Sequence, residues 1–265
     1  MKISEDNIIT EDKMSAELTV CDHLRSLKLS GSLYEFNRQK QEPASHSLSF
    51  DERLAMILGA QVDLRINRRI QRRTKEAELK ISSRPEEIDY NHHRSITKSQ
   101  MQEILSLSFV RRAHNIIITG PTGVGKTYIA CAIGTAGISA DLAVRYYRLS
   151  SLFDQIAVSR QDGTYKRLVS YLRSRDLLII DDFSLAPIPS RGSRELLDLL
   201  DARIGQNSTI IATQMPIAVL HQTFEDATVA DAILDRLVHD SIRLEMKGES
   251  MRKIRAEYPQ PGDGS

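Results

Sequence analysis

Apolar residues follow two different rhythms along this chain of 265 residues, and the rhythm changes near residue 115. Ahead of that point they recur at helical spacing in the segments 20–38, 50–80 and 98–112. Ser49 and Glu52, three residues apart at the start of the second segment, fit a capping box. Residues 1 to about 15 are polar and predict a loose terminus. The first part of the chain is therefore expected to be helical.

From residue 115 onward, short apolar runs rich in β-branched residues alternate with helical periods. Strands are predicted at 116–118, 141–148, 177–182, 208–213 and 241–246. Helices are predicted after Thr127, twice within 149–175, at 191–205 and at 229–238. This alternation predicts an α/β fold, in which a parallel sheet lies between helices and binds ligands at the carboxyl ends of its strands.

Residues 115–127, NIIITGPTGVGKT, fit the pattern Gly-x-x-x-x-Gly-Lys-Ser/Thr between a predicted strand and a predicted helix. Glycines leave the backbone N–H groups open to triphosphate oxygens, and the helix N-terminus adds further donors. Lys126 is expected to reach the β- and γ-phosphates of ATP, and the Thr127 hydroxyl to ligate Mg²⁺. The predicted ATP-binding residues are Gly120, Pro121, Thr122, Gly123, Val124, Gly125, Lys126, Thr127 and Tyr128.

Polar side chains end two of the predicted strands. Asp181 closes the run LLIIDD, where a carboxylate can hold magnesium, and Asp182 beside it can orient the attacking water. Thr213 and Gln214 end the strand STIIAT, where a polar group can touch the γ-phosphate. The alternative interpretations are that the two acids form only a solvated strand end and that Thr213 only caps its strand.

Arg236 lies far downstream in the amphipathic segment DAILDRLVHD. An arginine that reaches a neighbour's phosphate can stabilise transition-state charge by about 10³- to 10⁵-fold in rate. The alternative is a local salt bridge to Asp231, Asp235 or Asp240. Arg252, in KGESMRK, is a weaker candidate for a phosphate or interface contact.

One face of the helix predicted at 50–80 is strongly basic, and no acid lies between Leu64 and Lys75. The arginines at helical spacing on this face are Arg65, Arg68, Arg69, Arg72 and Arg73. Such a strip suits the phosphates of double-stranded DNA, although a solvated face near acidic helices is the alternative. The net charge is only +1, so DNA binding would depend on local patches such as this one.

The sequence contains no apolar run long enough to span a membrane, and its first residues lack the apolar region of a signal peptide. These features predict a soluble, cytoplasmic protein that has no membrane partner.

The motifs GPTGVGKT, LLIIDDF, ADAILDRLVH and KGESMRK, in this order, resemble those of the IstB-like ATPases, helper proteins of insertion-sequence transposition within the initiator and helicase-loader branch of the AAA+ ATPases. The segments LRSLKLSG, LSFDERL and IDY nearer the N-terminus resemble the family as well, so the similarity extends from about residue 20 to 256. The glycine loop alone would indicate only an NTPase; the combination of motifs is specific.

The resemblance implies a helical N-terminal domain for DNA or partner binding (1–90), an AAA+ ATPase domain without a C-terminal lid (91–256) and a disordered tail (257–265). It implies an ATPase that assembles as a homo-oligomer on double-stranded DNA, delivers that DNA to a partner transposase and stimulates the transposase. In this reading the catalytic residues are Lys126, Asp181, Asp182, Thr213, Gln214 and Arg236, with Thr127 and Asp181 at the metal. Lys166 and Arg167 would add a DNA contact at the pore side of the assembly.

Two positions depart from the family pattern: Ser184 replaces a frequent glycine, and Asp182 stands where AAA+ proteins usually have glutamate. The shorter acid would sit further from the water, so slow basal hydrolysis is expected. A loader of the DnaC type for a replicative helicase remains an alternative function, which the arginine-rich helix disfavours. A metabolic P-loop kinase is a weaker one, because it would have no use for Arg236 or the basic helix.

Overall fold

The computed structural model describes residues 5–90, 95–183 and 187–251, with the backbone alone for 5–15 and 46. Its contacts divide the chain into two compact units, Met1–Gln71 and Arg72–Ser265. Residues 72–90 therefore group with the second unit, and the domain boundary at residue 90 stays a prediction. Among the described residues, no helix combines the length and apolar character needed to cross a membrane.

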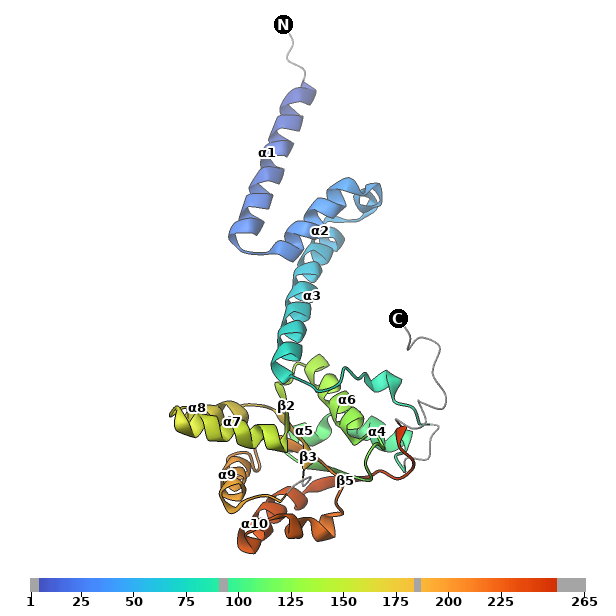
Figure 1. Ribbon diagram of the computed structural model, residues 1–265. Helices are drawn as coiled ribbons and strands as arrows, with labels where there is room; N and C mark the ends of the chain where they lie inside the picture. The colour runs from blue at the N-terminus through green and yellow to red at the C-terminus, as the bar shows by residue number, and fades with distance from the viewer. Residues whose placement is uncertain (1–4, 91–94, 184–186, 252–265) are drawn as a thin grey trace, which may run out of the picture. The chain divides into compact units, whose positions relative to one another are not determined.

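The first unit is helical, as predicted (Figure 1). Its elements are α1 (Glu5–Ser26), α2 (Ser30–Gln41), the 3-10 helix η1 (Pro43–Ser47) and α3 (Phe50–Ala77), which continues into the second unit. The predicted capping box is confirmed: Ser49 N donates to Glu52 Oε2 (2.8 Å), and Glu52 N to Ser49 Oγ (3.3 Å). Two predictions are wrong. A helix begins at Glu5 instead of a loose terminus, and the helix expected over 20–38 breaks where Lys28 adopts a φ of 57°.

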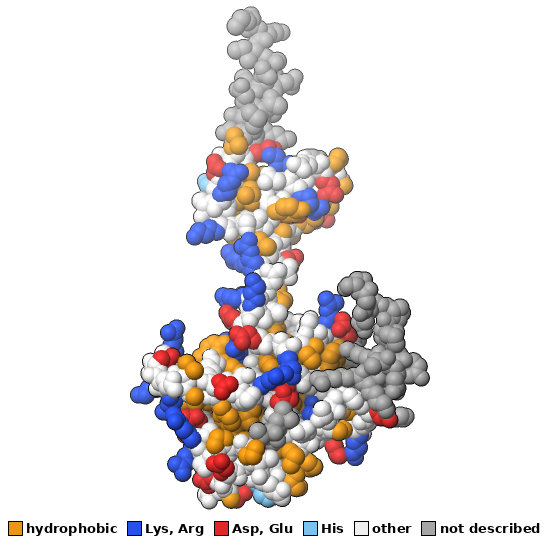
Figure 2. Space-filling model, viewed as in Figure 1, with side chains coloured by type: hydrophobic (Ala, Val, Ile, Leu, Met, Phe, Trp, Pro, Cys, Tyr) orange, Lys and Arg blue, Asp and Glu red, His pale blue; other side chains and the backbone are white. Residues whose placement is uncertain are grey.

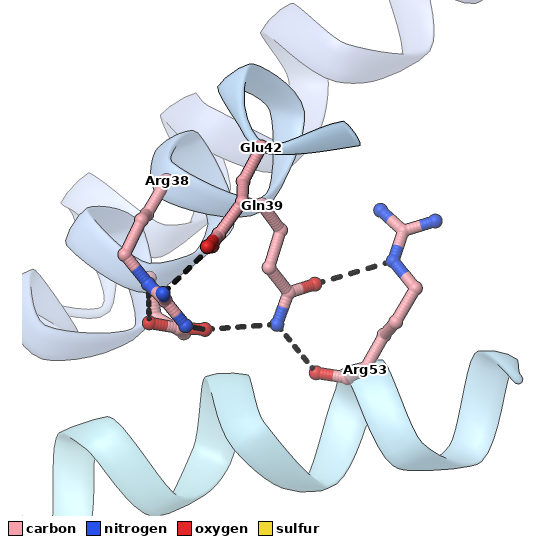
Figure 3. A network of polar contacts seen from close by, with 5 residues as sticks. Arg38, Gln39, Glu42 and Arg53 are labelled. Carbon is pink, nitrogen blue, oxygen red and sulfur yellow. Dashed lines mark hydrogen bonds and ion pairs between the residues drawn. The ribbon is translucent and has the colours of Figure 1, made fainter. Parts of the chain in front are cut away.

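Close backbone approach holds α2 on α3. A Cβ on Gly31 would lie 2.6 Å from the carbonyl oxygen of Ala60, so only glycine fits this crossing. Near the far end of α2, the buried Gln39 amide donates to Arg53 O (3.1 Å) and accepts from Arg53 Nε (3.2 Å), as Figure 3 shows. Gly31 is thus a packing position between α2 and α3.

The second unit is the predicted α/β domain. Its strands are β1 (Asn115–Thr119), β2 (Val144–Arg148), β3 (Leu177–Phe183), β4 (Ser208–Thr213) and β5 (Ser241–Glu245). Its helices are η2 (Pro85–Glu87), α4 (Lys98–Leu105), α5 (Ser108–Arg111), α6 (Lys126–Ser139), α7 (Leu149–Gln161), α8 (Tyr165–Arg173), α9 (Ser190–Asp201), η3 (Ile217–Thr223) and α10 (Ala227–Val238). The helix predicted over 98–112 is split at Leu107, whose φ of 57° interrupts it.

All neighbouring strands pair in parallel, in the order β2-β3-β4-β1-β5. Helix α6 packs on one face of the sheet, while α7, α8, α9 and α10 enclose an apolar cluster on the other (Figure 1). No helical lid follows β5 in the described part of the chain. Because the strands are parallel, every carboxyl end lies at one edge of the sheet, which we call the carboxyl edge; we call the opposite edge the amino edge.

Candidate functional site

The glycine loop occupies residues 120–125, between the end of β1 and the start of α6 at the carboxyl edge. Gly120, Gly123 and Gly125 adopt φ values of 149°, 86° and 105°, which disfavour other residues. A Cβ on Gly120 would lie 2.3 Å from the Met246 carbonyl oxygen, and one on Gly123 would lie 2.2 Å from Ser250 Oγ. Conformation and space therefore both require glycine at Gly120 and Gly123, and the loop leads directly into the N-terminus of α6, which favours anions.

The other loop residues differ in their surroundings. Lys126 Nζ donates to the carbonyl oxygens of Gly120 (2.7 Å) and Pro121 (2.9 Å). Burial lowers the pKa of the Lys126 ammonium, and the nearby carboxylates of Asp181 and Asp182 oppose that shift. The side chain of Val124 is buried, those of Pro121 and Thr122 are exposed, and Tyr128 is intermediate.

Asp181 is buried at the centre of a hydrogen-bond cluster. Its Oδ2 accepts from Thr127 Oγ1 (2.7 Å) and from the Tyr146 hydroxyl (2.8 Å). Burial, followed by the charge of Asp181, raises the pKa of Tyr146 far above its usual range, so this hydroxyl remains a donor. Thr127, in the first turn of α6, and Asp181, near the end of β3, are therefore in direct contact, and their shared role at a metal stays a prediction.

A β-bulge brings the second acid to the same side as the first. The register between β3 and β4 shifts between Ile180 and Phe183, and Asp182 adopts a φ of 54°. Successive side chains of a regular strand face opposite sides. Here Lys80 Nζ lies 3.8 Å from Asp181 Oδ2 and 3.6 Å from Asp182 Oδ2. Asp182 Oδ2 also lies 3.3 Å from Arg148 Nε.

The oxygen atoms of Thr127 and Asp181 fit magnesium in the presence of a triphosphate. Mg²⁺ prefers oxygen ligands and is usually held by one or two carboxylates together with phosphate oxygens and water. No cluster of three or more His, Cys, Asp or Glu side chains suited to a metal occurs among the described residues. The oxygen atoms of Thr127 and Asp181 thus suit a metal that arrives with nucleotide.

Thr213 and Gln214 have different surroundings at the end of β4. Thr213 is buried, and its Oγ1 accepts from Met215 N (3.1 Å), which is the cap considered as an alternative. The side chains of Gln214 and Thr122 meet, with 2.7 Å between Oε1 and Oγ1. Gln214 therefore touches the glycine loop, whereas the Thr213 hydroxyl caps its own strand.

Arg236 lies at the amino edge, away from its own glycine loop. Its carbonyl accepts from Asn115 Nδ2 (3.1 Å), and Asn115 begins β1, whereas the loop follows the end of β1. At about 3.3 Å per residue, the strand separates the two places by roughly 13 Å. The guanidinium pairs with Asp201 on α9 and donates to Ala232 O (2.7 Å). Asp201 was not among the three aspartates considered from the sequence.

A pocket of about 180 Å³ opens beside Arg236. Its lining includes the basic residues Arg112, His114, Arg203, Arg236 and His239. Arg203 is buried and supports the wall: its guanidinium donates to the carbonyls of Leu172, Arg175 and Ser208 and to Thr209 Oγ1. Burial lowers the pKa of Arg203 to about 9.

The basic residues predicted to contact DNA have different environments. Side chains of Lys and Arg gather along α3 in Figure 2. Arg65, Arg68 and Arg69 are exposed, with Arg68 Nη2 3.4 Å from Ser30 Oγ. Arg73 Nε lies 2.9 Å from Asp141 Oδ1, and its side chain is 20% exposed, so it has a packing role within the second unit.

Arg72, Lys166 and Arg167 are the other residues predicted to contact DNA. Arg72 lies on the second unit's part of α3, with Nε 3.7 Å from Glu76 Oε1. Lys166 and Arg167 are exposed in the first turn of α8. Ser184 and Arg252 lie outside the described residues.

Five residues at the site were not singled out from the sequence: Lys80, Tyr146, Arg148, Met246 and Ser250. Tyr146 belongs to a strand that was predicted for its apolar character alone. Ser250 falls in KGESMRK, and Met251 N donates to Gly123 O (2.9 Å), so residues 250–251 of this motif pack on the glycine loop. Of these residues, only Ser250 lies in a motif that stands out in the sequence. The others reach the site through tertiary packing, which local sequence patterns do not reveal.

The model of the IstB-like ATP binding protein family matches residues 22–257. An insertion sequence ATP-binding protein of Sinorhizobium fredii, y4pL, is 35% identical over 88% of this chain and 95% of its own length. The insertion sequence IS1162 ATP-binding protein of Pseudomonas fluorescens is 37% identical over 73% of this chain and 84% of its own length. The AMPPCP-bound DnaA structure from Aquifex aeolicus has a TM-score of 0.54 at 19% identity, covering 68% of this chain and 55% of that one, which is a likeness of fold.

Proposed function

Because this chain belongs to the family of IstB-like ATP binding proteins, we propose that it is an ATPase that assembles on double-stranded DNA, delivers that DNA to a partner transposase and stimulates the transposase. Its relatives are named as ATP-binding proteins of insertion sequences. ATP binding is the family's common property; hydrolysis, assembly and the partners are the proposed part.

Different residues at the carboxyl edge would have different roles in ATP binding and hydrolysis. Loop N–H groups and Lys126 would hold the phosphates, while Thr127 and Asp181 would ligate magnesium, which offsets phosphate charge. Asp182 would orient the attacking water. Gln214, whose side chain touches the loop, would contact the γ-phosphate. Hydrolysis by the isolated protein is expected to be slow.

The observation that carries the proposal is the place of Arg236. Its backbone is fixed at the start of β1, one strand length from the glycine loop of the same chain. A phosphate bound at the carboxyl edge could meet this arginine only if a second copy placed its amino edge there. The pocket beside Arg236 is also lined by Arg112, with Asp240 as the acidic residue of its lining. ATP would then be shared between two copies, and its binding would favour assembly.

Direct DNA contact is assigned to the exposed arginines of α3 and to Lys166 and Arg167. Reversing Arg68, Arg69 and Arg72 to Glu should lower duplex affinity at least about 100-fold and flatten its salt dependence, while ATP binding is kept. Arg73 is left intact because of its contact with Asp141. Arg25→Glu, at an exposed arginine paired with Asp22, is the control. Unchanged duplex affinity in the triple variant would remove α3 from the DNA surface.

The alternative is a loader for a replicative helicase. The support for it is a likeness of fold, at 19% identity to a DnaI crystal structure (TM-score 0.52; 62% of this chain and 91% of that one). Co-precipitation with the transposase, but not with the helicase, is the result expected here. The opposite result would favour the loader.

Electron microscopy of the protein with duplex DNA tests the assembly directly. With a non-hydrolysable ATP analogue, multimers closed around DNA are expected, with Arg236 of one copy at the nucleotide of the next. Without nucleotide, they should be absent. A protein that stays monomeric with saturating nucleotide and DNA would contradict the proposal.

A further inference from the structure

Lys80 approaches the acids of the site from a segment far from them in sequence. It follows the last turn of α3, and its Nζ lies within 4 Å of both Asp181 and Asp182. Its side chain is 27% exposed, whereas that of Arg148, which reaches Asp182 alone, is 50% exposed. Lys80 is thus the less solvated of these two cations and the one that spans both acids.

The segment that carries Lys80 is anchored on the second unit at three places. Arg73 Nε lies 2.9 Å from Asp141 Oδ1. The buried Arg145 on β2 donates to Glu76 O (2.8 Å) and to Glu78 Oε2 (2.6 Å). Next in the chain, the Leu79 side chain packs at Gly134 on α6, where an added Cβ would lie 3.1 Å from it. The chain that leads up to Lys80 is therefore held against the second unit.

We infer that Lys80 is a positioning residue of the ATP site, which holds the Asp182 carboxylate and offsets the charge of the Asp181–Asp182 pair. The inference rests on the proposed function, because it takes these aspartates as the acids of an ATP site. Two adjacent carboxylates repel each other and an arriving triphosphate, and an ammonium 3.6–3.8 Å away reduces both effects. The bulge that turns Asp182 toward Asp181 makes such compensation necessary.

The test compares the full-length protein with Lys80→Met, Lys80→Gln and Lys80→Arg. The first two remove the charge, and the third keeps it. Lys98→Met, at an exposed lysine that begins α4, is the matched control. Melting temperatures within about 2 °C of the wild type would show that the variants are folded. If Lys80→Met is not folded, Lys80→Gln replaces it as the variant without the charge.

Fluorescent ATP binding gives a readout other than turnover. In EDTA, Lys80→Met should bind about tenfold more weakly than the wild type, because the two carboxylates that face the triphosphate then lose one of their nearby cations. With excess Mg²⁺, the affinities should agree within about twofold, since the metal supplies charge at Asp181. Lys80→Arg and Lys98→Met should match the wild type in both conditions.

Turnover at saturating Mg²⁺ and ATP should fall about tenfold in Lys80→Met with KM unchanged, and Lys80→Arg should restore most of it. Equal EDTA affinity and equal kcat in Lys80→Met and the wild type would overturn the inference. A rise in kcat would also overturn it, because Lys80 would then obstruct Asp182. If the wild type neither binds nor hydrolyses ATP, the proposed function fails, and this inference fails with it.

Discussion

The two edges of one parallel sheet carry opposite kinds of chemistry. The carboxyl edge presents loop N–H groups, Thr127 and two carboxylates, whereas the amino edge presents Arg236 in a basic pocket. In the described part of the chain, α10 brings no arginine to the glycine loop at the carboxyl edge, because Arg236 lies a strand's length away at the amino edge. This separation is the reason for our proposal that two copies form the catalytic unit, each of which would contribute one edge.

Lys126→Ala is expected to give the largest loss, at the carboxyl edge. Removing the phosphate-binding charge should lower turnover by roughly 10⁴-fold and weaken ATP binding as well, because no other ammonium extends from the loop. Isothermal titration and a phosphate-release assay measure both effects. Lys98→Met is the control, and near-normal ATP binding by Lys126→Ala would place the nucleotide elsewhere.

Arg236→Ala should distinguish the role of the amino edge from that of the carboxyl edge, because it should lower turnover without weakening ATP binding by the single chain. Turnover on DNA is expected to fall about 10³-fold, while ATP binding to the single chain stays within about twofold, because the arginine is a strand's length from its own loop. Arg243→Ala, at an exposed arginine on β5, controls for charge. Weakened binding in dilute, monomeric Arg236→Ala would mean that Arg236 acts within its own chain.

Arg203→Met should affect stability and leave the carboxyl edge intact. The substitution leaves the carbonyls of Leu172, Arg175 and Ser208 without this donor, and the loss, reduced by removal of a buried charge, is expected to be about 2–3 kcal/mol. Urea unfolding measures it. A variant as stable as the wild type would contradict the structural role given to this cation.

Thr213→Val is expected to have the smallest effect of these substitutions. Its hydroxyl accepts from Met215 N, so loss of the cap should cost about 1 kcal/mol and lower turnover only a few-fold. Gln214→Ala should reduce turnover more, because Gln214 touches the loop. If Thr213→Val lost as much turnover as Gln214→Ala, the hydroxyl would have a direct part in the reaction.

Local patterns in the sequence predicted most of the fold and half of the site. Glycines, a lysine and a hydroxyl at fixed spacing predicted the loop, because that chemistry is confined to a few successive residues. The β-branched runs predicted the five strands, and Ser49 with Glu52 predicted the start of α3.

What the sequence did not predict depends on contacts between distant positions. The pairing of Arg236 with Asp201 joins α10 to α9, and Lys80 reaches Asp182 across about a hundred residues of chain. No periodicity encodes such a meeting. The arginine strip on α3 was identified from spacing alone, and spacing could not reveal that Arg73 is committed to Asp141.

Mixing two inactive variants tests the shared site most directly. Lys126→Ala lacks a working carboxyl edge but keeps Arg236, and Arg236→Ala has the reverse defect. Combined in equal amounts on duplex DNA with ATP, they should recover roughly a quarter of wild-type turnover, since some junctions then pair an intact loop with an intact arginine. Turnover no higher than the sum of the two separate variants would contradict a nucleotide site shared between copies.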